Sequence, residues 1–226
     1  MRYTSVILGR FQNRPNRFIA HVLVDGETVV CHVKNTGRCR ELFVPGATVV
    51  LAKGENPARK TAYDVIAVYK GDKLINIDSQ APNQVFREWA QGGGFLDHMT
   101  LIRPEYVYGQ SRLDFYVEAD GKRCLVEVKG VTLEEDGCVR FPDAPTQRGG
   151  KHLRELTAAV SEGYDCYVCF VIQMEGVSYF SPNRVTDPAF ADALIQAAQS
   201  GVHILAYDCR VTEDSLCMGN PVPVVL

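Results

Sequence analysis

Two acidic residues and a lysine in the middle of the chain could act together on a phosphate ester. Asp114 precedes the short motif formed by Glu127, Val128 and Lys129. Mg²⁺ prefers carboxylate and carbonyl oxygens and keeps several waters. A bound ion would lower the pKa of such a water and polarise a phosphate, and Lys129 would orient the water or stabilise developing charge. The motif therefore predicts an Mg²⁺ (or Mn²⁺) site on Asp114, Glu127 and the Val128 carbonyl, with Lys129 as a catalytic residue.

A predicted β-hairpin brings these residues together. Asp120-Gly121 is a turn pair preferred in two-residue hairpins. Counting back from this turn places Asp114 directly opposite Glu127, where Cβ atoms lie about 4.5–5.5 Å apart. Lys129 follows Glu127 by two positions and shares its face of the strand. The hairpin therefore predicts two carboxylates and one ammonium at one spot.

The motif also has a purely structural interpretation. Asp…Glu-x-Lys recurs by chance, and Lys129 could simply neutralise Glu127 in a cross-strand charge cluster. The hairpin register, the apolar neighbours Val126 and Val128, and the helix and strand that follow favour the functional interpretation. Together these features are typical of the restriction-endonuclease-like, or PD-(D/E)XK, nucleases.

Two more residues are candidates for the same site. Glu88, on a helix before the sheet, could supply a further acidic group, although a solvent-facing glutamate fits that position equally well. Gln173 ends a strand, where a polar group could complete the site or cap the strand. We list both as candidate catalytic residues.

Residues 81–226 read as alternating helices and strands. Pro82-Asn83 begins a helix, Thr146 precedes a second, and Asp187-Pro188 has N-cap and N1 chemistry for a third. This alternation with strands implies a mostly parallel sheet covered by helices. The antiparallel hairpin makes the sheet mixed. The predicted strands are Leu113–Glu118, Lys122–Lys129, Tyr164–Ile172 and Val202–Tyr207.

Residues 1–80 read as short strands separated by turns. Asp25-Gly26 has the chemistry of a hairpin turn, and five or six strands in such a length indicate a small OB-like barrel, a fold that binds oligonucleotides or oligosaccharides. The domain boundary is expected near residues 79–84. The predicted strands are Arg17–Val24, Thr28–Val33, Ala47–Lys53, Ala62–Tyr69 and Lys73–Asp78.

Charge is distributed unevenly along the chain. Residues 1–60 contain ten Lys or Arg and four Asp or Glu, whereas residues 61–226 contain fourteen and twenty-three. A basic half indicates an anionic partner such as DNA, although an unevenly charged solvated surface is an alternative. Phe11 and Phe18 could stack on bases, with core packing the expected fate of Phe18. The candidate DNA-binding residues are Arg10, Arg14, Arg17, Lys34, Arg38, Arg40, Arg148 and Lys151.

The eight cysteines are expected to be reduced thiols. The first residues lack the apolar stretch of a signal peptide, and no apolar run approaches the roughly 20 residues that span a membrane, so we expect a cytoplasmic protein. Cys166 and Cys169 lie three positions apart in a predicted strand and therefore face opposite sides. This spacing argues against a shared zinc ion.

The chain contains, in this order, the segments Arg14–Ala20, Asn35–Arg38, Arg112–Phe115, Val126–Leu133, Phe141–Ala144 and Lys151–Leu156. In these segments it resembles the sugar fermentation stimulation protein A family, over nearly its whole length. The resemblance implies an OB-like N-terminal domain, a nuclease-like C-terminal domain, DNA binding with little sequence preference and a role in regulating sugar metabolism. Two departures are Lys34, where the family usually has proline, and Gln147, where glutamate is usual.

Three classes of function follow from the sequence. The first is a DNA-binding protein with an Mg²⁺-dependent phosphodiesterase site, favoured because a site without catalysis has no reason to keep two repelling carboxylates. The second is a DNA-binding regulator whose nuclease fold no longer cuts, favoured by the acidic C-terminal half, which repels DNA. The third is an oligosaccharide-binding barrel, which would need exposed aromatic residues more than arginines.

Overall fold

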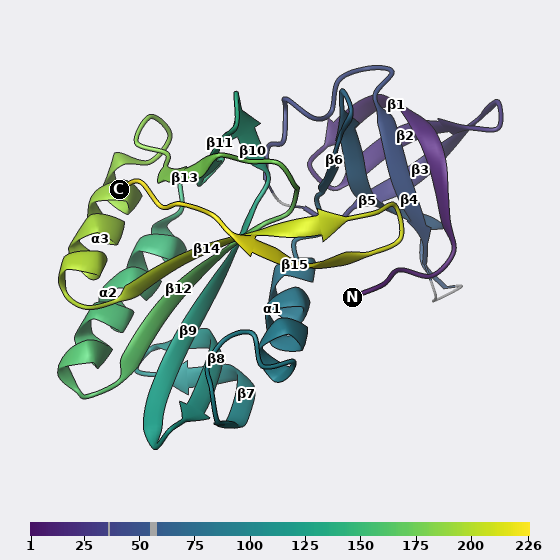
Figure 1. The fold of residues 1–226 in the computed structure, drawn as a ribbon. Helices are drawn as coiled ribbons and strands as arrows, with labels where there is room; N and C mark the ends of the chain where they lie inside the picture. Colours follow the sequence, from purple (N-terminus) through teal and green to yellow (C-terminus); the bar gives the residue numbers. More distant parts are fainter. Residues whose placement is uncertain (36, 55–57) are drawn as a thin grey trace.

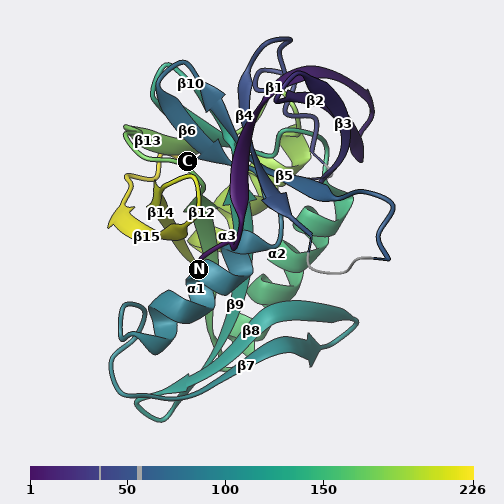
Figure 2. The ribbon, with the colours of Figure 1, turned by 90° about the vertical axis from the view of Figure 1, so that its right-hand side faces the viewer.

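The computed structural model describes residues 1–35, 37–54 and 58–226. Thr36, one residue of the Asn35–Arg38 segment, lies outside the described residues. A β-barrel and a helix-covered sheet lie side by side, with the barrel formed by the first third of the chain (Figures 1 and 2). No helix in the described ranges is long and apolar enough to cross a membrane.

The barrel confirms the predicted OB-like architecture. Its strands are ordered β3-β2-β1-β4-β5-β6, and a parallel pairing between β3 and β5 closes the barrel. The sequence did not predict β1 because Gly9 and Phe11 are its only buried residues, which leaves no visible alternation. The strands are β1 (Val6–Asn16), β2 (Ile19–Val24), β3 (Glu27–Val33), β4 (Thr48–Lys53), β5 (Tyr63–Lys70) and β6 (Lys73–Asn76).

The turn between β1 and β2 corrects the prediction for Phe18. The Asn16 side chain accepts hydrogen bonds from the backbone N–H groups of Phe18 and Ile19, so the chain turns where the sequence predicted a continuous strand. Phe18 consequently points outward and is 49% exposed, and the expectation that it packs in the core is wrong. Phe11, by contrast, is buried in the barrel.

The second sheet is mixed, as predicted, but fewer of its pairings are parallel than expected. Its order is β15-β14-β12-β9-β8-β7, and only the two pairings of β12, with β9 and with β14, are parallel. The antiparallel edge strands β7 and β15 were not predicted, because both carry mainly exposed or half-buried residues. The strands are β7 (Met99–Tyr108), β8 (Ser111–Ala119), β9 (Lys122–Val131), β12 (Asp165–Ile172), β14 (His203–Val211) and β15 (Leu216–Pro221).

Three helices cover this sheet, and two of them, those after Thr146 and Asp187, begin with a side-chain cap. The Thr146 hydroxyl accepts the N–H of Gly149, and the Asp187 carboxylate accepts the N–H of Phe190. Helix α1 packs on one face of the sheet, and α2 and α3 pack together on the other (Figure 1). The helices are α1 (Ala81–Gln91), α2 (Gln147–Ser161) and α3 (Pro188–Gln199), and a small separate sheet contains β10 (Leu133–Glu135), β11 (Cys138–Phe141) and β13 (Tyr179–Pro182).

Two apolar cores lie on opposite faces of the second sheet, and the cysteines are divided between them. Cys166 belongs to the core under α2 and α3, whereas Cys169 belongs to the core under α1. The prediction that their sulfurs face opposite sides of β12 is therefore confirmed. All eight cysteines are free thiols, and all but Cys217 are buried.

Thiol counting on freshly purified, denatured protein should find eight free thiols. The buried thiols react slowly in the folded state, since burial raises the pKa of Cys31, Cys39 and Cys166 to about 12. Without denaturant we therefore expect rapid labelling of Cys217 alone. Stoichiometric zinc in elemental analysis, or fewer than eight thiols, would contradict the assignment.

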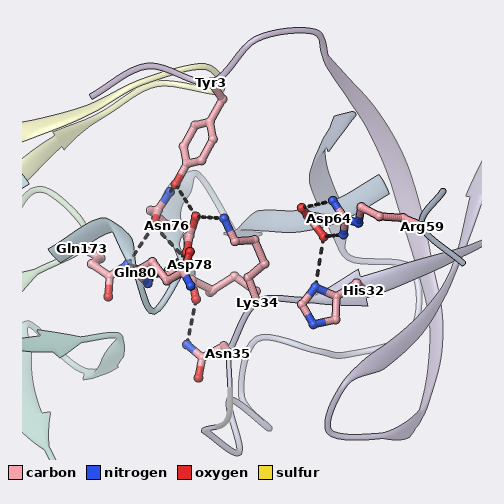
Figure 3. Close-up of polar contacts among 11 residues, drawn as sticks. Tyr3, His32, Lys34, Asn35, Arg59, Asp64, Asn76, Asp78, Gln80 and Gln173 are labelled. Atoms are coloured by element: carbon pink, nitrogen blue, oxygen red, sulfur yellow. Dashed lines mark hydrogen bonds and ion pairs between the residues drawn. The ribbon is translucent and has the colours of Figure 1, made fainter. Parts of the chain in front are cut away.

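A buried polar network joins the barrel to the second sheet (Figure 3). We call Tyr3, Lys34, Asn76, Asp78 and Gln173 the junction network. Lys34 Nζ lies 2.7 Å from the Asp78 carboxylate, which also accepts the Tyr3 hydroxyl at 3.2 Å. The Gln173 amide, at the end of β12, donates to Asn76 Oδ1 at 2.7 Å and to the Asp78 carbonyl at 3.0 Å. Side chains of both halves therefore complete one another's hydrogen bonds.

Candidate functional site

The β8–β9 hairpin has the predicted turn and register. Asp120 and Gly121 have φ angles of 50° and 74°, the positive values that a type I′ turn requires. Backbone pairs run from Ala119 with Lys122 to Phe115 with Val126. The register prediction is confirmed over this length.

The strand twists at Asp114, which corrects the predicted position of its carboxylate. Leu113 and Phe115 should share a face but belong to different cores, and Glu105 on the neighbouring strand β7 has a φ angle of 53°. Asp114 does not extend the register opposite Glu127. Its Oδ2 atom instead accepts the backbone N–H of Val128 at 2.7 Å. The prediction of a directly opposed pair is therefore wrong, because the side chain takes the place of a strand-to-strand hydrogen bond.

Glu127 is almost fully buried, and its two carboxylate oxygens have different surroundings. Its Oε1 atom accepts Lys129 Nζ and is in hydrogen-bond contact with His152 Nδ1. Its Oε2 atom is buried and has no hydrogen-bond partner among the residues that the structure describes. An unsatisfied buried carboxylate oxygen is costly unless a further ligand occupies it.

The two carboxylates have opposite pKa shifts. Burial, followed by the charge of Glu127, raises the pKa of Asp114 above its usual value. Burial alone would also raise the pKa of Glu127, but the hydrogen bond from His152 and the charge of Lys129 outweigh it and lower that pKa. Glu127 is therefore readily ionised, whereas Asp114 ionises with difficulty unless a cation lies nearby.

Two residues that support this pair were not selected from the sequence. Asn83, in the first turn of α1, donates its amide to Asp114 Oδ1 at 2.8 Å. Arg148 Nε donates to His152 Nε2 at 3.4 Å, so His152 carries its proton on Nδ1 and donates it to Glu127. A sequence signal for His152 existed, because it shares the buried helix face of Leu153 and Leu156.

Glu88 and Gln173 bond to partners other than the two carboxylates. Glu88 lines a hollow of 510 Å³ that also reaches Asp114, but its carboxylate binds the amino group of Met1 at 2.5 Å. The Gln173 amide belongs to the junction network, and a Cβ atom added to Gly130 would lie 2.6 Å from its Oε1. Gln173 therefore packs against the residue that follows Lys129 and holds the end of β9 against the barrel.

The carboxylate pair fits a magnesium-type ion that retains waters. No group of three or more His, Cys, Asp or Glu residues in the described part of the chain could hold a metal ion by itself. Mg²⁺, however, is commonly held by one or two carboxylates together with waters and substrate phosphates. The unpartnered Oε2 of Glu127 and the neighbouring Asp114 provide such oxygens. The Val128 carbonyl stays a predicted ligand.

The candidate DNA-binding residues divide into engaged and free side chains. Arg14 donates to four backbone carbonyls around residues 17–38 and lies 4.7 Å from the Phe43 ring, so it holds a loop in place. In the part of the chain that the structure describes, exposed Arg17, Arg38 and Arg40 have no partner for their guanidinium groups. The other engaged residues are Arg10 with Thr48, Lys34 with Asp78, Arg148 with His152, and Lys151 with the Gln110 carbonyl.

An OB barrel followed by a restriction-endonuclease-like α/β domain defines the class of protein. Residues 13–77 match the family model described as "SfsA N-terminal OB domain", and residues 80–215 match "Sugar fermentation stimulation protein RE domain". The chain belongs to the sugar fermentation stimulation protein family.

Several known proteins resemble the whole chain. A sugar fermentation stimulation protein homolog of Desulfitobacterium hafniense is 57% identical, with 100% of this chain and 99% of the relative covered. A homolog of Clostridium beijerinckii is 54% identical over the full length of both. Among solved structures, Pyrococcus furiosus SfsA in complex with Ca²⁺ has a TM-score of 0.91 at 26% identity, covering 100% of this chain and 98% of that one.

Proposed function

We propose that the protein binds DNA and hydrolyses phosphodiester bonds at a divalent-metal site on Asp114 and Glu127. The single observation that carries the proposal is the buried Oε2 atom of Glu127, which lacks a hydrogen-bond partner among the described residues and lies beside a second carboxylate. A cation bound there would relieve the repulsion between the carboxylates and satisfy the oxygen. The OB barrel supports a nucleic-acid ligand.

The similar Pyrococcus furiosus protein was solved with Ca²⁺, a hard cation that takes oxygen ligands as Mg²⁺ does. Asp114, Glu127 and the Val128 carbonyl would hold Mg²⁺ or Mn²⁺ in this chain. When bound, the ion would supply a water of lowered pKa and polarise the phosphate.

The surrounding residues position these groups. His152 holds one oxygen of Glu127, which leaves the other oxygen for a ligand. Asn83 and the Val128 N–H fix the two oxygens of Asp114. Lys129 lies against Glu127 and is partly exposed, so its ammonium group can reach a phosphate oxygen and stabilise transition-state charge.

Incubation with labelled DNA and RNA tests the activity. Purified protein should cleave at least one of single-stranded DNA, duplex DNA and RNA in the presence of Mg²⁺ or Mn²⁺, and EDTA should stop the reaction. If no substrate is cleaved and calorimetry detects no Mn²⁺ binding at millimolar concentration, the phosphodiesterase proposal fails.

DNA binding should be strongly salt-dependent and insensitive to sequence. A plot of the logarithm of affinity against the logarithm of salt concentration falls with a slope of roughly 0.7 in magnitude for each neutralised phosphate of a single strand. For the three free arginines we expect a slope of roughly two, the same for unrelated sequences. Fluorescence anisotropy in EDTA measures this slope, and a salt-independent affinity would contradict it.

A DNA-binding regulator that does not cut is the second candidate. The excess of acidic residues in residues 61–226 supports it, because this charge repels a phosphate backbone from the second domain. Such a regulator would fit a role in sugar metabolism, as the names of the relatives suggest. It predicts sequence-independent binding without cleavage, and it becomes the better account if DNA is bound but metal is not.

A further inference from the structure

A cleft lies between the barrel and the second domain, beyond the end of β9. It consists of two joined hollows of 380 and 620 Å³, and Arg17, Gly37, Ala144 and Pro145 line both. We call these two hollows together the interdomain cleft. Gly130, which directly follows Lys129, lines its inner end. The cleft therefore extends from the barrel surface to the residue that follows Lys129 in β9.

The cleft is positively charged. Arg17, Arg38 and Arg40 line it, and their guanidinium groups have no partner among the described residues. Arg140, which pairs with Glu135, lines the hollow that contains Gly130. The acidic residue Asp143 also lines it, but its Oδ2 atom accepts the backbone N–H of Arg38 at 2.8 Å. The cleft therefore favours an anionic ligand that can contact several arginines in succession.

The lining also contains apolar surface suited to bases. The rings of Phe43 and Phe141 and the side chain of Pro145 contribute to it. Phe18, 49% exposed, lines an adjoining hollow that shares Asn35 and Ser79 with the cleft. Proteins bind unpaired strands with positive charge combined with aromatic rings, because every unpaired base offers a face for stacking.

The size of the hollows argues against a duplex inside the cleft. Each hollow falls within the roughly 300–1,000 Å³ typical of small-molecule sites, which suits a few nucleotides of one strand. In a duplex the bases stack on each other, so a duplex would present only its backbone and could not use the apolar lining.

We propose that the interdomain cleft binds one unpaired DNA strand, with its phosphates on Arg17, Arg38 and Arg40 and a base on Phe18 in the adjoining hollow. This proposal rests on the proposed DNA binding and adds the form of the substrate. A strand in the cleft would lead toward Lys129, so the enzyme would act on single-stranded or frayed DNA in preference to intact duplex.

Anisotropy titrations in EDTA test the proposal with an oligo(dT) strand of about 12 nucleotides, within the range that one OB barrel covers, and a blunt duplex of equal length. Wild-type protein should bind the strand at least about tenfold more tightly. Arg17→Glu and Arg38→Glu should each weaken strand binding about tenfold and reduce the salt slope by roughly one. Arg103→Glu changes an exposed residue of β7, a strand that lies at the other end of the molecule from the barrel (Figure 2), and should change neither.

Phe18→Ala separates strand binding from simple charge attraction. Loss of one stacked base should weaken strand binding about tenfold and leave duplex binding unchanged. Three results would overturn the proposal while leaving DNA binding intact. They are tighter binding of the duplex than of the strand, equal effects of Phe18→Ala on both ligands, and an effect of Arg103→Glu equal to that of Arg17→Glu. Tighter binding of oligo(U) than of oligo(dT) would show that the bound strand is RNA, and would overturn the proposal that it is DNA. Absence of binding to every ligand would instead overturn the proposed function.

Discussion

Replacing Lys129 with alanine is expected to reduce metal-dependent cleavage by about 10²–10³-fold, the usual cost of removing one electrostatic group from a transition state. The metal ligands would remain, so Mn²⁺ binding should persist in calorimetry. Lys129 also neutralises buried Glu127. Lys129→Arg keeps that charge, and with its larger head group we expect near wild-type stability but reduced cleavage. If Lys129→Ala cleaves at the wild-type rate, the lysine has only a structural role.

Asp114→Asn should give the complementary result, with loss of both metal binding and cleavage in a folded protein. Folding raises the pKa of Asp114, so the protonated carboxyl group favours the folded state and the ionised carboxylate disfavours it. The stabilisation from the protonated form is lost as the pH rises through the folded-state pKa. At neutral pH the asparagine variant should therefore be at least as stable as wild type. This advantage should shrink as the pH falls toward the ordinary value of 3.8. Urea unfolding at several pH values measures it, and a large loss of stability would show that the carboxylate is needed for the fold.

Replacing Lys34 with methionine should produce the largest loss of stability. Asp78 is 1% exposed, and Lys34 is the cation that lies against its carboxylate. Removing one partner of a buried ion pair leaves an uncompensated charge and costs about 3 kcal/mol. For a protein of this size, that corresponds to a fall in Tm of roughly 6–12 °C.

Two further variants make the Lys34 result interpretable. Lys53→Met removes an exposed lysine from β4 and should change Tm little. Adding Asp78→Asn to Lys34→Met removes the unpaired charge and should recover part of the lost stability. If Lys34→Met costs no more than Lys53→Met, the buried pair does not stabilise the junction.

The features that the sequence predicted correctly are those decided by local chemistry. The Asp120-Gly121 turn fixes the hairpin register, and Thr146 and Asp187 fix the starts of two helices. Each depends on a few adjacent residues whose conformational preferences are strong.

The features that the sequence did not predict depend on contacts between distant residues. The twist of β8 at Asp114 accompanies a left-handed residue on β7, a strand whose sequence gives no alternation. Asn83 and His152 reach the carboxylates from helices on opposite faces of the sheet, so no spacing along the chain relates them. Lys34 appeared free to contact DNA, but its partner Asp78 becomes a neighbour only when the barrel closes.

The junction network has a mechanical consequence for the whole molecule. The buried Gln173 amide of the second domain donates to Asn76 and Asp78 of the barrel segment. Separating the two domains would leave the Gln173 amide without these acceptors and would expose the buried Asp78 carboxylate. The first residues of the chain also cross back to the second domain, where Arg2 pairs with Ser215. We therefore expect the barrel and the sheet to unfold together as one cooperative unit, so that the interdomain cleft keeps its position relative to the carboxylates for as long as the protein is folded.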